Sequence, residues 1–181
     1  MDAIRQCAGV ALVLFAVALS AAGCASHVAG KSHEVEQQRV AANLANFADL
    51  DLNVYTNQKW NELHRSHSKD VIVHWPDGRI TKGIEPHIKD MQWTFTWAPD
   101  TRIKLQPVKV GQGDWTAVIG EMEGTFTRPM PMPDGTTIPP TGKAYKIRLA
   151  TFAHWTKEGP MDEEYLFWDN QDFMRQIGLG K

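Results

Sequence analysis

A cluster of acidic, basic and aromatic residues near the C-terminus has the side chains needed for general acid–base chemistry. The segments 144–156 and 161–168 both favour β-branched and aromatic residues, and the sequence Lys157-Glu158-Gly159-Pro160 between them is typical of a turn. Together they predict a β-hairpin, in which directly opposed residues point to the same face. In the predicted register, Glu163 opposes His154. One face of the hairpin then carries Arg148, Phe152, His154, Glu163, Tyr165 and Asp169.

Asp169 and His154 are the candidate catalytic residues of this face. A carboxyl group at the end of an apolar cavity has its ionised form disfavoured by desolvation, which raises its pKa towards neutrality and suits proton transfer. Arg148, opposed to Asp169 in the hairpin, would instead lower that pKa and form a clamp for an anion or a carbonyl. Asp169 is equally suited to cap a C-terminal helix. His154 is either a proton shuttle or a hydrogen-bonded core histidine.

Further residues are candidates for contact with a substrate. Only one of the adjacent Glu163 and Glu164 can enter a cavity, because neighbouring residues of a strand point to opposite faces, and we predict that it is Glu163. His74, at the end of a predicted strand, either lines the cavity or is structural. Trp93 and Trp97, near the end of the predicted third helix, either stack on a flat substrate or pack in the core. The predicted substrate-binding residues are His74, Trp93, Trp97, Arg148, Phe152, Glu163 and Tyr165.

The sequence predicts neither a metal site nor a cofactor. His64 and His67 are spaced to share a helix face, but no carboxylate or third ligand is evident beside them, so a solvated face is the better interpretation. The chain contains no G-x-G-x-x-G, G-x-x-x-x-G-K-[ST], H-E-x-x-H or G-x-S-x-G motif. Nucleotide binding through these motifs and the common hydrolase signatures are therefore excluded.

Helices are expected in the first half of the chain's folded part. Apolar residues recur at helical spacing over 34–48 and again over 50–63, which predicts two N-terminal helices. The short segment 71–75 is typical of a strand, and Pro76-Asp77-Gly78 ends it with a turn. A third helix is expected after Gly83. Its apolar face consists of Ile84, Ile88, Met91 and Phe95.

Strands are expected in the second half. The segments rich in β-branched and aromatic residues are 103–110, 115–127, 144–156 and 161–168. Three helices followed by a four-strand meander make an α+β domain. The segment 128–143 is too rich in proline and glycine for a helix or strand. It is expected to form a long loop, and such loops often have a function.

Overall composition indicates an ordinary globular domain. The chain has 181 residues, of which 43% are hydrophobic and 22% charged, and its formal net charge is −2. These values exclude a disordered chain and a strongly basic, general nucleic-acid binder.

The N-terminus has the layout of a secretory signal. An uncharged apolar run over 8–19 is followed by small residues and then Cys24, a pattern that resembles the lipobox of bacterial lipoproteins. We predict a signal peptide at 1–23, a lipidated Cys24 with a linker to residue 33, and a domain at 34–181 anchored to a bacterial membrane in the cell envelope. The alternative is an uncleaved membrane anchor, because the stretch from Cys7 to Cys24 is uncharged.

Five sequence motifs follow one another along the chain in an order that is informative as a whole. They are the strand and turn VIVHWPDG, the helix led by Gly83, Gly124-Thr125, IPPTGK at 138–143, and EEYLFWDNQDFMRQIGL at 163–179. In this order they resemble the SnoaL-like polyketide cyclase or ester cyclase family of the nuclear transport factor 2-like superfamily. The resemblance implies a cone in which three N-terminal helices are wrapped by a curved, mainly antiparallel sheet around a cavity, with a short C-terminal helix. It also implies a homodimer and a catalytic acid at Asp169.

The expected function follows from this resemblance. It is a cofactor-independent enzyme that uses a cavity aspartate for acid–base chemistry on a small apolar carbonyl or ester compound. A lipoprotein that only binds an apolar small molecule is the alternative, and a purely structural dimer module is a third interpretation. The expected partners are an apolar ligand, a membrane through the lipid anchor and a second copy of the chain, but no nucleic acid.

Overall fold

The computed structural model describes residues 32–180. The predicted signal peptide, Cys24 and most of the predicted linker lie outside the described residues, so signal processing and lipid anchoring remain predictions. Within residues 32–180, no helix is both long and apolar enough to cross a bilayer. Residues 40–181 form one compact unit, and the fold below is that of its described part.

The N-terminal helices differ in part from the prediction. Residues 32–49 form the first expected helix, which continues as one π-helical segment, η1 (Leu50–Tyr55). The second expected helix is replaced by η1 and a short 3₁₀ helix, η2 (Trp60–Arg65). Gln58 separates these two with a positive φ of 55°, a left-handed conformation that a regular helix does not contain. The predicted third helix is α2 (Ile84–Trp97), which begins after Gly83 and ends before Pro99.

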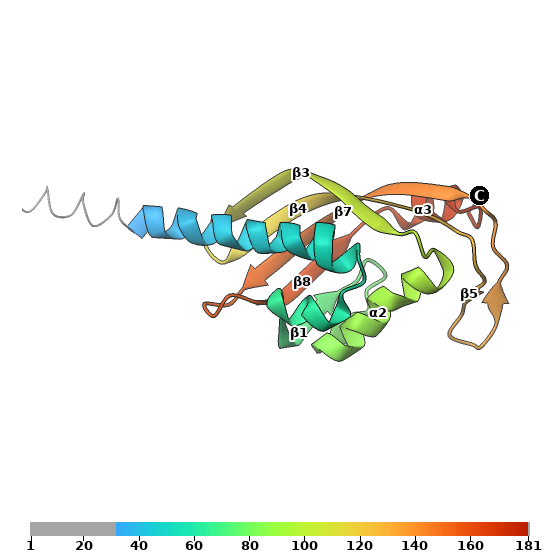
Figure 1. Ribbon diagram of the computed structural model, residues 1–181, viewed down its shortest axis with the longest axis horizontal. Coiled ribbons are helices and arrows are strands. Elements are labelled where there is room, and N and C mark those ends of the chain that lie inside the picture. The colour runs from blue at the N-terminus through green and yellow to red at the C-terminus, as the bar shows by residue number, and fades with distance from the viewer. Residues whose placement is uncertain (1–31, 181) are drawn as a thin grey trace, which may run out of the picture. The chain divides into compact units, whose positions relative to one another are not determined.

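The strands form a six-stranded sheet in the order β2-β1-β8-β7-β4-β3. Their bounds are β1 His67–His74, β2 Ile80–Lys82, β3 Arg102–Gln112, β4 Trp115–Thr125, β7 Ala144–Trp155 and β8 Met161–Phe167. The predicted meander is confirmed: β3, β4, β7 and β8 pair antiparallel in sequence and run side by side in Figure 1. β1 joins the meander by pairing parallel to β8. The short helix α3 (Asn170–Gln176) follows β8, so the expected α+β cone is confirmed.

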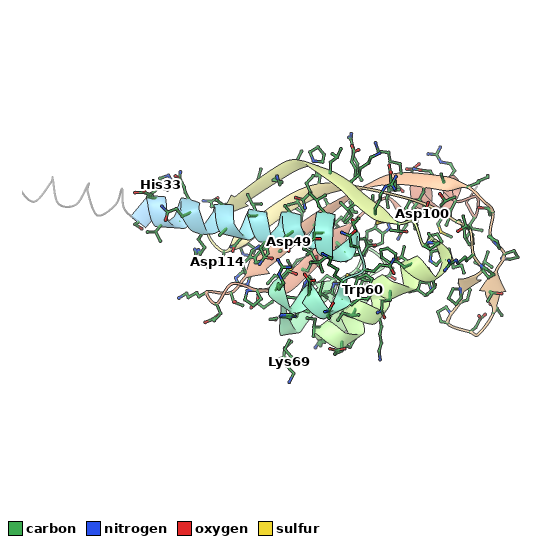
Figure 2. All side chains as sticks on the ribbon, in the orientation of Figure 1. His33, Asp49, Trp60, Lys69, Asp100 and Asp114 are labelled. Atoms are coloured by element: carbon green, nitrogen blue, oxygen red, sulfur yellow. The ribbon has the colours of Figure 1, made fainter. Side chains whose placement is uncertain are left out.

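One face of the sheet is buried, and the other is largely exposed. Along β7 the side chains alternate strictly, and the buried members are Tyr145, Ile147, Leu149, Thr151, Ala153 and Trp155. We call this the inner face. It packs against the helices in a cluster that contains Phe47, Leu50, Val54, Leu63 and Trp155. Trp60, labelled in Figure 2, lies edge-on to Phe95 of α2, with ring centroids 5.5 Å apart.

The predicted long loop at 128–143 contains a small hairpin of its own. Its strands are β5 (Met130–Pro131) and β6 (Thr137–Ile138), and they pair antiparallel. At the turn, Asp134 Oδ1 accepts hydrogen bonds from the backbone N–H and the hydroxyl of Thr136. Met130 is buried against Trp97 and its neighbours. The hairpin therefore packs on the core instead of covering the cavity described below.

Gly124 of β4 is required by the packing of Tyr145 on the inner face. A Cβ atom at this position would lie 2.6 Å from the Tyr145 hydroxyl and 2.8 Å from Cζ. The tyrosine ring cannot move away easily, because it is buried and its hydroxyl hydrogen-bonds Thr101 Oγ1 at 2.7 Å. We expect Gly124→Ala to lower the free energy of unfolding by about 1–3 kcal/mol, measured by urea denaturation.

Gly120→Ala is the matched control in the same strand. Its added Cβ would meet its neighbours at 3.4 Å or more, which is ordinary van der Waals contact. An equal loss of stability in both variants would contradict this prediction, because the contact with Tyr145 would then not be the cause of the loss in Gly124→Ala.

Candidate functional site

A cavity of about 310 Å³ lies on the inner face of the sheet, under the helices. Its walls come from η1, β1, α2, β3, β4, β7, β8 and α3. Most of the lining is apolar or aromatic, including Leu50, Tyr55, Met91, Trp93, Leu149 and Leu166. Four titratable side chains in the cavity are buried, namely Asp51, His67, His87 and Glu164. An apolar pocket with a few convergent polar groups is the usual form of a small-molecule site.

Asp51 is the carboxyl group that the fold places in the cavity from the helical side. It belongs to η1, whose neighbours Leu50 and Val54 are in the core. Gln106 Nε2 of β3 donates a hydrogen bond to Asp51 Oδ2 at 2.6 Å. Burial raises the pKa of Asp51 to about 7, with a smaller contribution from the negative charge of Glu164 and against the lowering effect of the Gln106 hydrogen bond. At neutral pH this group is divided between its acid and base forms, as a proton-transfer residue requires.

Tyr55 lies four residues further along η1 and also lines the cavity. Its hydroxyl donates to Met122 Sδ at 3.6 Å. Burial raises the pKa of Tyr55, so the phenol stays protonated at neutral pH. A protonated phenol beside Asp51 can donate a hydrogen bond to a substrate oxygen.

Two histidines and a glutamate form a second polar group of the cavity. His67 Nε2 and His87 Nε2 lie 3.8 Å and 3.6 Å from Glu164 Oε2. Burial lowers the pKa of His87 to about 4, so its imidazole is neutral at neutral pH. For Glu164, burial raises the pKa, but the two adjacent imidazoles outweigh it and hold the pKa below its usual range. This group is therefore a buried carboxylate facing two imidazoles.

The predicted hairpin register is confirmed, but the predicted face is wrong. His154 pairs with Glu163 and Phe152 pairs with Tyr165, as expected. The residues of these two strands that line the cavity are on the other face, namely Leu149, Thr151, Glu164 and Leu166. The prediction that Glu163 enters the cavity in preference to Glu164 is thus contradicted.

The predicted substrate contacts around Glu163 form a network on the outer face of the sheet. Glu163 Oε1 accepts a hydrogen bond from the Tyr165 hydroxyl at 2.8 Å and lies 2.9 Å from His74 Nε2. The rings of His74 and Tyr165 stack with centroids 4.1 Å apart. The hydrogen bonds from Tyr165 and His74 lower the pKa of Glu163. None of these three side chains lines the cavity, and neither does Phe152, which is exposed.

The two predicted catalytic residues also lie outside the cavity. Asp169 caps α3: its Oδ1 accepts hydrogen bonds from the backbone N–H groups of Gln171 and Asp172 at 2.9 and 3.0 Å. β8 ends at Phe167, so the expected pair of Asp169 with Arg148 does not form. Arg148 instead bonds Glu121 through Nη2 at 3.2 Å.

The remaining predicted residues divide between cavity, core and surface. His154 lies on the outer face, where its Nδ1 is 2.6 Å from Asp162 Oδ1. Trp93 lines the cavity and donates from Nε1 to the backbone oxygen of Pro131 at 2.9 Å. Trp97 is fully buried in the core and does not line the cavity. His64 and His67 share no helix, because His67 begins β1.

The buried polar residues of the cavity were missed because they are distant in sequence. Asp51, His87 and Glu164 carry no local motif, and each stands among residues of helical or strand pattern. A signal for Glu164 was nevertheless present. The odd-numbered residues of 145–155 are the more apolar set, and Glu164 opposes Ala153 of that set in the predicted register.

The raised pKa of Asp51 predicts a pH-dependent effect of Asp51→Asn on stability. The folded protein keeps the Asp51 proton up to about pH 7, whereas the unfolded chain loses it near the ordinary aspartate pKa of 3.8. The wild type is therefore destabilised as the pH rises between these values, by up to about 1.4 kcal/mol per pH unit. Asparagine mimics the protonated acid. We expect the stability of Asp51→Asn relative to the wild type to increase over this range and then level off, as measured by urea denaturation.

Glu123→Gln is the control of opposite sign. The hydrogen bond from Arg102 lowers the pKa of Glu123, so this substitution should cost stability at neutral pH and lose its effect as the pH falls below the pKa of a free glutamate. A pH-independent stability difference for Asp51→Asn would contradict a raised pKa.

Comparisons with known proteins agree with the fold. The family of SnoaL-like polyketide cyclases matches residues 45–177. Among solved structures, IdmH of Streptomyces antibioticus, described as a candidate polyketide cyclase, is similar with a TM-score of 0.63 and 19% identity, over 75% of this chain and 98% of that one. A candidate SnoaL-like polyketide cyclase from Jannaschia sp. CCS1 is similar with a TM-score of 0.66 and 16% identity, over 78% and 94% of the two chains.

A third solved structure, of a hypothetical protein, also shares the fold. A protein from Catenulispora acidiphila with a ketosteroid isomerase-like fold, solved with trimethylamine, has a TM-score of 0.58 and 14% identity, over 76% of this chain and 92% of that one. None of the curated protein sequences matches the chain significantly. The family match covers most of the chain, including the segments that form the cavity. The chain belongs to the SnoaL-like polyketide cyclase family.

Proposed function

We propose that this protein is an acid–base enzyme that forms an enolate from a small apolar carbonyl or ester compound, with Asp51 as the proton-transfer residue. The proposal rests on one observation. A carboxyl group with a pKa of about 7 lies in an otherwise largely apolar cavity of about 310 Å³. Membership of a polyketide cyclase family supports this class of chemistry. Asp51 takes the role that the sequence suggested for Asp169.

The proposed reaction needs one base and one hydrogen-bond donor. The ionised Asp51 carboxylate removes a proton from the carbon next to the substrate carbonyl, and the electron pair moves onto the carbonyl oxygen. The Tyr55 hydroxyl, which lines the same cavity, donates a hydrogen bond to that oxygen. The enolate carbon then either adds to a second carbonyl of the same molecule, closing a ring, or takes the proton back at another position. In the first case the new alkoxide oxygen takes the proton from Asp51, so the carboxylate is restored in both cases. Gln106 is a positioning residue, because it holds Oδ2 of Asp51.

The cell-envelope location predicted from the N-terminal sequence is part of this proposal. An enzyme anchored by lipid at Cys24 would meet apolar compounds that partition into the membrane. The alternative function is a binding lipoprotein, in which the same cavity holds an apolar molecule without converting it.

Hydrogen–deuterium exchange next to a carbonyl tests the proposed proton transfer without knowledge of the natural substrate. A panel of apolar ketones and β-keto esters is incubated with the protein in D₂O, and loss of the α-proton signal is followed by NMR. We expect catalysed exchange that rises with pH to a plateau above about pH 7, because the base must be ionised. Asp51→Asn should lower the rate by about 100- to 10,000-fold.

Glu163→Gln is the matched control, because this carboxyl group lies outside the cavity. It should exchange the panel at the wild-type rate. If the wild type is no faster than buffer while the same compounds quench its tryptophan fluorescence, the binding lipoprotein becomes the better interpretation. Loss of exchange in Glu163→Gln with retention in Asp51→Asn would return the catalytic role to the outer face.

We also propose that the chain forms the predicted homodimer through the outer face of its sheet. Phe152 and Phe167 lie edge-on to each other there, 45% and 52% exposed, and Trp115 is exposed on the same face. Burial of these rings by a second copy would remove apolar surface from water. We expect Phe152→Asp to give a monomer in sedimentation velocity, whereas Leu52→Glu, at an exposed apolar residue of η1, leaves the dimer intact. A wild-type monomer would overturn the proposal.

A further inference from the structure

His67, His87 and Glu164 come from three elements that the topology brings together. His67 is the first residue of β1, His87 lies in the first turn of α2, and Glu164 is in the middle of β8. β1 pairs parallel to β8, and Gly83, just before α2, donates from its backbone N–H to the Val71 oxygen of β1. All three side chains are buried and line the cavity. Donor atoms from the three lie within 4.8 Å of one another.

Three buried atoms of this cluster lack the hydrogen bonds that buried polar groups normally have, and two of them, His67 Nε2 and Glu164 Oε2, face each other. His67 Nε2, His87 Nδ1 and Glu164 Oε2 are each buried without a hydrogen-bond partner. Such groups are rare in native proteins, and each one calls for an explanation such as an absent ion. Here three of them belong to one cluster of metal-ligand residue types.

The hydrogen bonds around His67 allow a tautomer whose Nε2 carries no proton. When the Ser66 hydroxyl donates to the backbone oxygen of Leu63 at 3.1 Å, its oxygen accepts from His67 Nδ1 at 2.9 Å. Nδ1 then holds the proton of the neutral ring, and Nε2 presents a lone pair. That lone pair faces the Glu164 carboxylate, another acceptor, at 3.8 Å. A positive species between the two atoms would satisfy both.

The geometry fits a metal ion better than direct contact. Zinc binds histidine nitrogen at about 2.0–2.1 Å and carboxylate oxygen at about 2.0–2.2 Å, so two ligand atoms on one tetrahedral ion lie about 3.4 Å apart. The observed separations of 3.6 and 3.8 Å are close to that spacing and too long for a hydrogen bond. Two histidines with one carboxylate form a known ligand set for catalytic zinc and for non-haem iron, in which the remaining coordination positions stay open.

We propose that His67, His87 and Glu164 bind a divalent first-row transition-metal ion, with its open coordination positions towards the cavity. Ser66 acts as the outer-shell partner that orients the His67 ring. This site goes beyond the proposed function and does not depend on it, because proton transfer by Asp51 requires no metal. It also departs from the expectation of a metal-free protein, since the three ligands are too far apart in sequence to form a motif.

Metal titration of the full-length chain tests the site directly. The protein is purified in mild detergent with a chelator, dialysed, and titrated with Zn²⁺ against a chromophoric chelator and with Co²⁺ by visible absorption. We expect one equivalent of either ion, a d–d spectrum typical of nitrogen and oxygen ligands, and a higher Tm with Zn²⁺. His67→Ala and Glu164→Gln should each weaken zinc binding by at least about 100-fold, since even loss of an outer-shell partner costs about 10- to 100-fold.

Two surface-histidine variants serve as controls. His64→Ala and His154→Ala should keep the stoichiometry and affinity of the wild type. Circular dichroism identifies a ligand variant that fails to fold, in which case Ser66→Ala, which retains all three ligands, should weaken binding by about 10- to 100-fold.

The competing explanation is a proton between His67 and Glu164. It predicts that the wild type does not bind Zn²⁺ or Co²⁺ at the cluster. Any weak binding would then occur at surface histidines, so that His64→Ala removes it and His67→Ala does not. Either result would overturn the metal site. The deuterium exchange assay, run in the presence of chelator, separates this outcome from failure of the Asp51 mechanism.

Discussion

The pairing of β7 with β8 is the constraint on which the site depends. Side chains on a strand alternate between two faces, and only one face of this sheet is covered by helices. The register that opposes Ala153 to Glu164 places that carboxylate in the cavity and Glu163 outside it. Covering the inner face with apolar helices then removes water from whatever titratable groups point inward. The same burial that stabilises the core changes the pKa values of Asp51, His87 and Glu164.

Burial of the titratable side chains in the cavity opposes folding stability, and the degree to which partners compensate for it indicates which side chains can serve a function. An ionised carboxyl group loses favourable hydration when it enters an apolar cavity, and folding is weakened unless a partner compensates. Asp51 has one hydrogen bond from Gln106, and Glu164 faces two imidazoles beyond hydrogen-bond distance. By contrast, Glu163 on the outer face has two close partners and partial access to water. The hydrogen bond from Gln106 does not offset the burial of Asp51, whose pKa stays raised, so this inner carboxyl group is available to a ligand.

The sequence predicted the fold well because periodicity and turn residues act locally. The α+β class, the third helix, the meander and the pairing of His154 with Glu163 all follow from patterns within short segments. The prediction of one regular second helix was wrong, because the chain interrupts it at Gln58, in a left-handed conformation between η1 and η2. The site was mostly missed for a different reason. The prediction assigned the hairpin face that carries the most polar residues to the cavity. The apolar residues Tyr145, Ile147 and Leu149 alternate on the opposite face, and this pattern already indicated that the opposite face is the buried one.

Asp169 and Asp51 differ in where the fold places their carboxyl groups. Asp169 follows the last strand, at the junction with α3, where the free backbone N–H groups of a helix start are the nearest partners for a short carboxylate. Asp51 instead stands on a helical segment between the buried Leu50 and Val54, so its carboxyl group enters the cavity with the face that these residues bury. A fold shared with candidate polyketide cyclases does not determine the chemistry, because the residues of the individual chain decide which acid lines its cavity. In this protein the carboxyl groups buried in the cavity are Asp51 and Glu164, beside the imidazoles of His67 and His87.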